Sequence, residues 1–115
     1  MPDQTVQVTF DPNATPQFTF TPSSVTMTGS GKVILQQSPA NASWTFDGAV
    51  VKDDTLDEFD ATVQGNGQQV QIDDSFKDRT EKGYSYDVTV ALNGQTYTSP
   101  DPQIVNDPGS VERAD

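Results

Sequence analysis

The residues of this chain best suited to chemistry are the carboxylates gathered in two segments, residues 53–60 and 73–78. Hard cations such as calcium take six to eight oxygen ligands, and neighbouring loops of a small domain can bring carboxylates together for that purpose. A calcium site is therefore one interpretation of these segments. Its candidate ligands are Asp53, Asp54, Asp57, Asp60, Asp73 and Asp74.

The same carboxylates have a simpler interpretation, which we prefer. Seventeen acidic residues face six basic ones, for a net charge of −11, and solvated carboxylates keep such a domain soluble. The EF-hand pattern is not met, because its glycine and its terminal glutamate have no counterpart here. Asp57 and Asp60 would share one side of a helical turn, which is the feature that keeps the cation alternative open.

Enzymatic chemistry has few residues to draw on. The chain has no cysteine and no histidine, so thiolates, disulfides and the commonest general base are all missing. A carboxylate-based hydrolase would need two acids flanking a cleft. A serine or threonine nucleophile would have only a lysine as base, and no lysine lies in a recognisable nucleophile motif. The four lysines are Lys32, Lys52, Lys77 and Lys82. We expect no enzymatic activity and no cofactor.

Charge and hydropathy also restrict the partners and the location. Nucleic acids and anionic membranes are disfavoured, because binding to either relies on an excess of lysine and arginine. No apolar run approaches the roughly 20 residues of a membrane-spanning helix. The sequence starts Met-Pro-Asp-Gln, without a basic start followed by an apolar core, so no secretion signal is visible and a cytoplasmic location is expected.

The elements that must position these residues are strands. Every second residue of Tyr84–Leu92 is apolar or aromatic, which is typical of a half-buried strand. Asn93-Gly94 follows directly and favours a type I′ turn, because both of its central residues need positive φ. The segment therefore predicts a β-hairpin that returns through residues 95–99.

Shorter alternating runs precede and follow this hairpin. They cover residues 5–10, 17–21, 24–28, 32–36, 42–46, 49–51, 62–64, 68–73 and 103–105. Trp44 is expected to anchor the core, and Asp47-Gly48 is expected to form a turn. One short helix is possible near residues 53–60, where Thr55 and Glu58 fit a capping box. We expect a folded domain over residues 1–105 and a polar tail over residues 106–115.

This spacing of short strands and turns predicts an all-β fold, an immunoglobulin-like antiparallel β-sandwich of about seven to nine short strands. An immunoglobulin disulfide is excluded by the missing cysteines. A cupredoxin copper site is excluded as well, because Met27 alone cannot hold the ion.

A short C-terminal motif carries a family resemblance. Residues 101–108 read Asp-Pro-Gln-Ile-Val-Asn-Asp-Pro, and this resembles the signature of the bacterial DP-EP family. Asp101-Pro102 takes the first place, and Asp107-Pro108 stands where the name leads one to expect Glu-Pro. The resemblance implies a small bacterial domain, an immunoglobulin-like sandwich and no assigned activity. It therefore supplies no catalytic residue.

Together these observations favour a non-enzymatic β-sandwich module that acts in protein binding or assembly. An exposed strand edge can accept another strand, either from a protein partner or from a second copy of the chain. Residues 5–9 and 68–72 are polar on one face and carry few charges, which is a permissive composition for an edge. We expect an unknown protein partner or self-association through strand edges.

Overall fold

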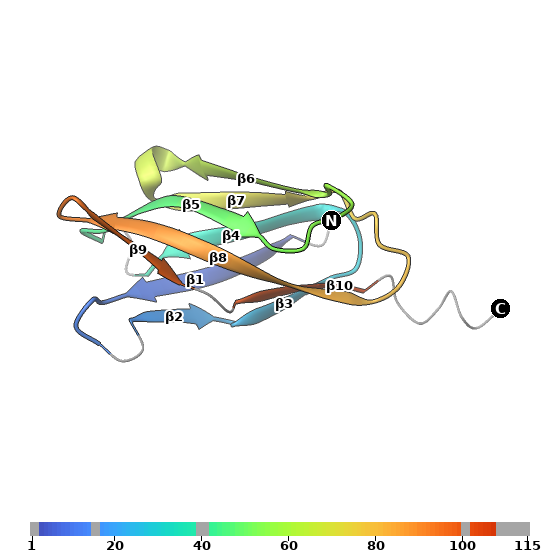
Figure 1. Ribbon diagram of the computed structural model, residues 1–115, viewed down its shortest axis with the longest axis horizontal. Coiled ribbons are helices and arrows are strands. Elements are labelled where there is room, and N and C mark those ends of the chain that lie inside the picture. The colour runs from blue at the N-terminus through green and yellow to red at the C-terminus, as the bar shows by residue number, and fades with distance from the viewer. Residues whose placement is uncertain (1–2, 15–16, 39–41, 100–101, 108–115) are drawn as a thin grey trace.

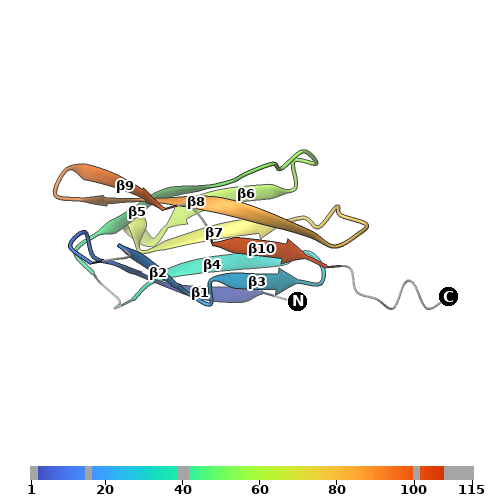
Figure 2. The ribbon, with the colours of Figure 1, turned by 60° about the horizontal axis from the view of Figure 1, so that its bottom comes forward.

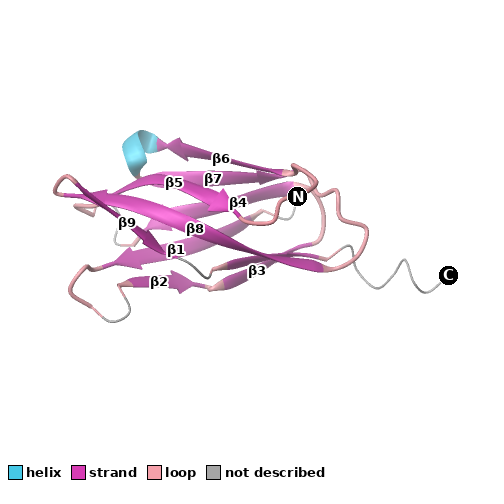
Figure 3. Cartoon of the chain, viewed as in Figure 1, coloured by secondary structure: helices cyan, strands magenta, loops and turns pink. Residues whose placement is uncertain are grey.

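The computed structural model describes residues 3–14, 17–38, 42–99 and 102–107, and these residues form ten strands and one short 3-10 helix (Figures 1 and 3). The prediction of an all-β fold is confirmed, with one strand more than the expected range. No described helix is long and apolar enough to cross a membrane. The elements are β1 (Gln4–Phe10), β2 (Phe18–Thr21), β3 (Ser24–Met27), β4 (Gly31–Gln37), β5 (Thr45–Val51), β6 (Phe59–Gln64), η1 (Gly65–Gly67), β7 (Gln69–Asp74), β8 (Lys82–Leu92), β9 (Gln95–Ser99) and β10 (Gln103–Asn106).

Two sheets face each other as the layers of a sandwich (Figure 2). The first has the strand order β2-β1-β4-β7-β6, and the second has the order β3-β10-β8-β5, with β9 also paired to β8. The pairs β1–β4 and β3–β10 are parallel, so both sheets are mixed, whereas the other strand pairs among the described residues are antiparallel, as the sequence predicted. The parallel pair β1–β4 arises because the chain leaves the first sheet as β3 before it returns as β4.

The core lies between the sheets and follows the alternation seen in the sequence. Val6, Val8 and Phe10 of β1 point inward, and their exposed neighbours point to solvent. Trp44, which directly precedes β5, is 3% exposed and packs edge-on against Phe46 with ring centroids 5.0 Å apart. The prediction that this tryptophan anchors the core is confirmed.

The predicted hairpin is present as β8 and β9. Leu92 pairs with Gln95, which leaves Asn93 and Gly94 as the two-residue loop. Their φ angles are 53° and 79°, both positive, as a type I′ turn requires. The first half of β8 pairs with β10 and its second half with β9, so this strand runs the length of the second sheet.

One local prediction is wrong, and the helix that the sequence allowed near residues 53–60 is absent from the described structure. Asp47-Gly48 does not form a turn, because β5 continues through it with a bulge between Phe46 and Gly48. Residues 53–60 form turns and the start of β6, without a helix. Asp53 and Asp57 have φ angles of 59° and 53°, which a right-handed helix does not allow.

The two lateral sides of the sandwich differ. At one side the chain passes directly from β2 in the first sheet to β3 in the second, so residues 18–27 form the edges of both sheets. At the other side β6 of the first sheet lies beside β5 of the second (Figure 1). Among the described strands β6 pairs only with β7, and β5 pairs only with β8. We call this second side, formed by β5, β6 and residues 52–58, the open side.

The strand order corrects the expected edges. Residues 5–9 lie in β1, between β2 and β4, and residues 69–72 lie in β7, between β4 and β6. Neither segment is an edge. The expected tail also begins one residue too early, because Asn106 belongs to β10 and is fully buried. Residues 108–115 lie outside the described part of the chain.

Candidate functional site

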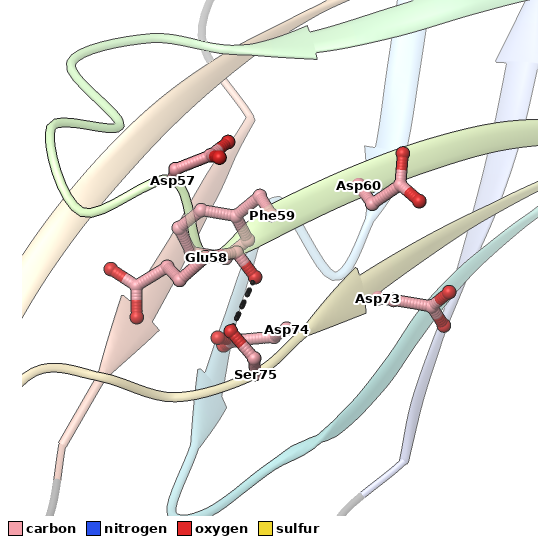
Figure 4. A pocket seen from close by; sticks show the side chains of 7 residues that line it. All are labelled: Asp57, Glu58, Phe59, Asp60, Asp73, Asp74 and Ser75. Atoms are coloured by element: carbon pink, nitrogen blue, oxygen red, sulfur yellow. Dashed lines mark hydrogen bonds between the residues drawn. The ribbon is translucent and has the colours of Figure 1, made fainter.

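The carboxylates of the two acidic segments meet where β6 begins and β7 ends. The antiparallel register places Phe59 opposite Asp74 and Asp60 opposite Asp73. A pocket of about 390 Å³ opens at this point (Figure 4). It is lined by Asp57, Glu58, Phe59, Asp60, Asp73, Asp74 and Ser75.

Behind the pocket lies a group of polar side chains that we call the buried carboxylate cluster: Glu58, Asp74, Asp78, Tyr84 and Asn106. The amide nitrogen of Asn106 lies 3.2 Å from Glu58 Oε1, 3.2 Å from Asp74 Oδ1 and 3.0 Å from Asp78 Oδ2. The Tyr84 hydroxyl donates toward Glu58 Oε2 at 2.8 Å and lies 2.9 Å from each oxygen of Asp78. Glu58, Asp74 and Asn106 are 3%, 2% and 0% exposed. The cluster therefore joins β7, β8 and β10 to the loop before β6.

Backbone donors hold two of these carboxylates in place. The N–H of Lys77 donates to Glu58 Oε1 at 2.8 Å, and the N–H of Phe76 donates to Asp74 Oδ1 at 2.9 Å. The N–H and hydroxyl of Ser75 both donate to the Glu58 carbonyl, at 2.9 and 3.1 Å. The segment that follows β7 therefore folds around Glu58.

The buried carboxylate cluster has fewer donor hydrogens than close contacts with carboxylate oxygens. The Asn106 amide and the Tyr84 hydroxyl make six close contacts with carboxylate oxygens but carry only three hydrogens between them. A proton bound by one carboxyl would lower the negative charge that these groups share. Burial raises the pKa of Asp74 from 3.8 to about 6, and the charges of Glu58 and Asp78 add to the increase. Burial and the same two carboxylates also raise the pKa of the Tyr84 hydroxyl, which keeps it a donor.

The candidate calcium ligands take three different positions. Four of them, Asp57, Asp60, Asp73 and Asp74, line the pocket. Asp54 instead accepts hydrogen bonds from two backbone N–H groups, those of residues 58 and 59, at 3.0 and 3.1 Å. Asp53 lies exposed in a turn. Over residues 3–14, 17–38, 42–99 and 102–107, no three acidic side chains are arranged to hold a metal ion, so the geometry does not favour the calcium alternative.

Two members of the buried carboxylate cluster escaped the sequence analysis. Tyr84 was expected to be buried, but one partner of its hydroxyl, Glu58, is distant in sequence, and the other, Asp78, lies in a loop whose path the sequence does not show. Asn106 was assigned to the tail. A signal was available for the latter, because Asn106 is two residues after Ile104 and therefore shares its inward face.

The open side carries a second feature, an apolar surface with acidic neighbours. Among the described residues, the large hydrophobic side chains that remain exposed are Val50 (65%), Leu56 (42%) and Val63 (39%), and all three belong to the open side. A smaller pocket of about 200 Å³ lies between β5 and β6. Its lining consists of Ala49, Val50, Val51, Asp54, Phe59, Asp60 and Ala61.

The basic residues near this surface are engaged within the domain. Lys52 forms an ion pair with Asp87 at 3.2 Å. The ammonium group of Lys77 lies 3.2 Å from the carbonyl of Leu56 and 3.5 Å from that of Asp57. Contacts with carbonyls leave the charge of Lys77 in place, but the exposed Asp53, Asp57 and Asp60 outnumber it, so the open side is negative on balance.

A comparison with models of known protein families assigns this chain to a family. No curated protein matches the chain. The model of the DP-EP family matches residues 2–108, nearly all of the chain. Of the signature, Asp101 and Pro108 lie outside the described residues, whereas Pro102 is buried and its carbonyl accepts a hydrogen bond from the N–H of Tyr86 at 3.0 Å. The signature thus leads into β10 and supplies Asn106 to the buried carboxylate cluster, and the chain belongs to the DP-EP family.

Proposed function

We propose that this domain is a non-enzymatic, cytoplasmic protein-binding module that accepts a strand of another molecule at the open side. One observation carries the proposal. The exposed large hydrophobic side chains of the described residues all lie beside two strand edges that have no partner within the described fold. An edge of this kind presents free N–H and C=O groups, and nearby apolar side chains add affinity when an incoming strand covers them.

The other edges support this choice by contrast. β2 and β3 have four residues each and are joined through Pro22, whereas β6 has six residues and β5 has seven. Among the described residues, β2, β3 and β9 carry no large hydrophobic side chain that is strongly exposed. A strand added to β6 or β5 would therefore pair over a longer stretch and bury more apolar surface than one added to β2, β3 or β9.

The arrangement of the carboxylates supports binding over catalysis. Glu58 and Asp74 accept hydrogen bonds from backbone N–H groups and from Asn106, so these two acids are engaged in holding the fold. Asp57 and Asp60 are exposed at the rim of the pocket. A hydrolase would need an acid kept protonated in a cleft beside a second, ionised acid that is free to act on substrate.

Site-specific photo-crosslinking tests the proposal. A photoreactive residue is placed at Val63 on the open side or, as the matched control, at Thr26, which is exposed on β3. In cells of the source organism we expect discrete adducts from position 63 that position 26 does not give. A further variant, Val63→Lys, places a charge on the edge strand and should remove binding without unfolding the domain. Equal labelling from both positions, or none from position 63, would refute the proposal.

A further inference from the structure

We infer that the strand accepted by β6 is a basic, extended segment of a different protein, with lysine or arginine opposite Asp60, and not a second copy of this chain. The inference rests on the proposed function and specifies the partner. It comes from the rows of side chains that cross the first sheet and end at β6.

The first row ends in two acidic residues. The register pairs Lys32 of β4 with Asp73 of β7, and Asp73 with Asp60 of β6. These three side chains share the outer face of the sheet, so the charges along the row are positive, negative and negative. Like charges directly opposite each other destabilise a strand pair, and opposite charges stabilise it. Within this sheet the cross-strand neighbour of Asp60 is another carboxylate, Asp73. A basic side chain on an added strand would lie on the other side of Asp60 and pair with it.

A second row on the same face, on the far side of Thr62, is made of amides. Gln7, Gln36, Gln69 and Gln64 follow one another across β1, β4, β7 and β6. The amide nitrogen of Gln7 donates to the side-chain oxygen of Gln36 at 3.3 Å. Gln64 ends this row at the edge, four residues after Asp60. A partner strand with glutamine or asparagine at that position would continue the row.

The inner face of β6 sets the remaining positions. Ala61 and Val63 point toward β5, and the pocket of about 200 Å³ separates Ala61 from Ala49 and Val51. Small or β-branched apolar side chains fit a space of this size. Thr62 occupies the outer face between the two rows and favours a β-branched residue opposite it. An antiparallel partner would therefore read Gln-Val-Thr-Val-Lys, from the position opposite Gln64 to the position opposite Asp60.

The charge of the open side favours a different protein over a second copy of this chain as the source of the added strand. Asp53, Asp57 and Asp60 are exposed at the open side and outnumber the two nearby lysines, one of which, Lys52, is already paired with Asp87. A second copy would bring the same carboxylates against this surface, and each copy carries a net charge of −11. Like-charge contact opposes self-association, whereas a basic segment is attracted from solution and held more weakly as salt screens the field.

Three capped peptides test the inference on the full chain. They share the sequence Gln-Val-Thr-Val-X within a common extended context, with X as lysine, glutamine or glutamate. Titration into the isotopically labelled chain, followed by NMR, gives both the affinity and the residues contacted. We expect shifts centred on β6 and about two- to fivefold tighter binding of the lysine peptide than of the glutamine peptide, as for one cross-strand ion pair. The glutamate peptide should bind more weakly still, and the preference should shrink at high salt.

Two variants make the test specific. Asp60→Asn should equalise the lysine and glutamine peptides, because it removes the carboxylate that the lysine faces. Asp11→Asn, the matched control, removes an exposed carboxylate from the connection between β1 and β2 and should leave the preference unchanged. Equal binding of the lysine and glutamate peptides at β6 would overturn the inference but leave strand binding intact. No shift at β6 with any peptide would overturn both, and sedimentation showing a dimer formed through β6 would overturn the inference in favour of self-association.

Discussion

Replacing Asp74 by asparagine should stabilise the domain at neutral pH. Asp74 is 2% exposed, one of its oxygens lies without a hydrogen-bond donor, and burial raises its pKa from 3.8 to about 6. The other oxygen accepts from the N–H of Phe76, and the asparagine carbonyl can keep that bond. Asparagine therefore preserves the shape and the main hydrogen bond of this residue while it removes the buried charge.

The sign and size follow from linkage between protonation and folding. A carboxyl whose pKa is higher in the folded state keeps its proton longer there, so its contribution to stability is complete below pH 3.8 and is lost as the pH rises toward 6. A shift from 3.8 to about 6 corresponds to about 3 kcal/mol, because each pKa unit is worth about 1.4 kcal/mol. Above pH 6 the charged carboxylate costs the folded state that amount, and Asp74→Asn should recover up to about 3 kcal/mol.

Urea unfolding of both proteins between pH 3.5 and pH 8 measures this difference directly. The free energies of unfolding should coincide at the acid end and separate between about pH 4 and pH 6. Asp60→Asn is the control, because this carboxylate lies exposed on the neighbouring strand and its loss should change stability by less than about 0.5 kcal/mol. Parallel profiles for the wild type and Asp74→Asn, or a variant that is less stable at pH 7, would refute the reasoning.

Three further substitutions test other parts of the fold. Tyr84→Phe should lower the free energy of unfolding by about 1–3 kcal/mol, because it removes the donor shared by Glu58 and Asp78. The control Tyr97→Phe removes an exposed hydrogen bond to Gln95 and should lower it by less than about 0.5 kcal/mol, so equal losses in urea unfolding would contradict this. Gly67→Ala should destabilise the domain by about 2–4 kcal/mol, because φ is 89° and the added Cβ would lie 2.7 Å from Thr45 Cβ. The control Gly94→Ala has a φ of 79° but no atom near the added Cβ and should cost about 1 kcal/mol, so similar melting temperatures for the two variants would exclude the clash. Asn106→Asp should lower the free energy of unfolding by about 3–5 kcal/mol at pH 7, because it adds a fourth carboxyl to the buried carboxylate cluster. The loss of stability should shrink as the pH falls toward 4, and a loss that does not depend on pH would argue against a charge effect.

The strands were predictable where alternation and turn chemistry agreed. The β8–β9 hairpin is an example, because its alternating run ends at Asn-Gly and both signals demand the same geometry. At Asp47-Gly48 they disagreed. The turn-forming pair lies inside β5, where pairing with β8 continues on both sides, from Phe46 opposite Val90 to Ala49 opposite Val88. Tertiary pairing thus overrides local preference, and the chain accommodates the pair as a bulge.

The candidate site was predictable only in part, because it depends on strand order. The alternation of Val70, Ile72 and Asp74 indicates an inward carboxylate, yet nothing in that pattern indicates that Glu58 and Asn106 face it. Edges are hidden for the same reason. β1 and β7 have a composition suited to an edge, but they lie inside the first sheet. Interior and edge strands share the same alternation of apolar and polar residues, so the sequence does not distinguish them.

The buried carboxylate cluster gives the family signature a structural role. Asn106 lies at the end of β10, and its amide contacts acids from the loop before β6, from β7 and from the segment after β7. A slip of β10 by one residue would replace this amide by Val105 or by the carboxylate of Asp107, and either would leave the acids without their shared donor. Buried polar groups often reduce stability but penalise wrong registers more strongly. Asn106 therefore favours the observed register of the last strand, which pairs with β8 on one side and β3 on the other and so joins these two strands of the second sheet.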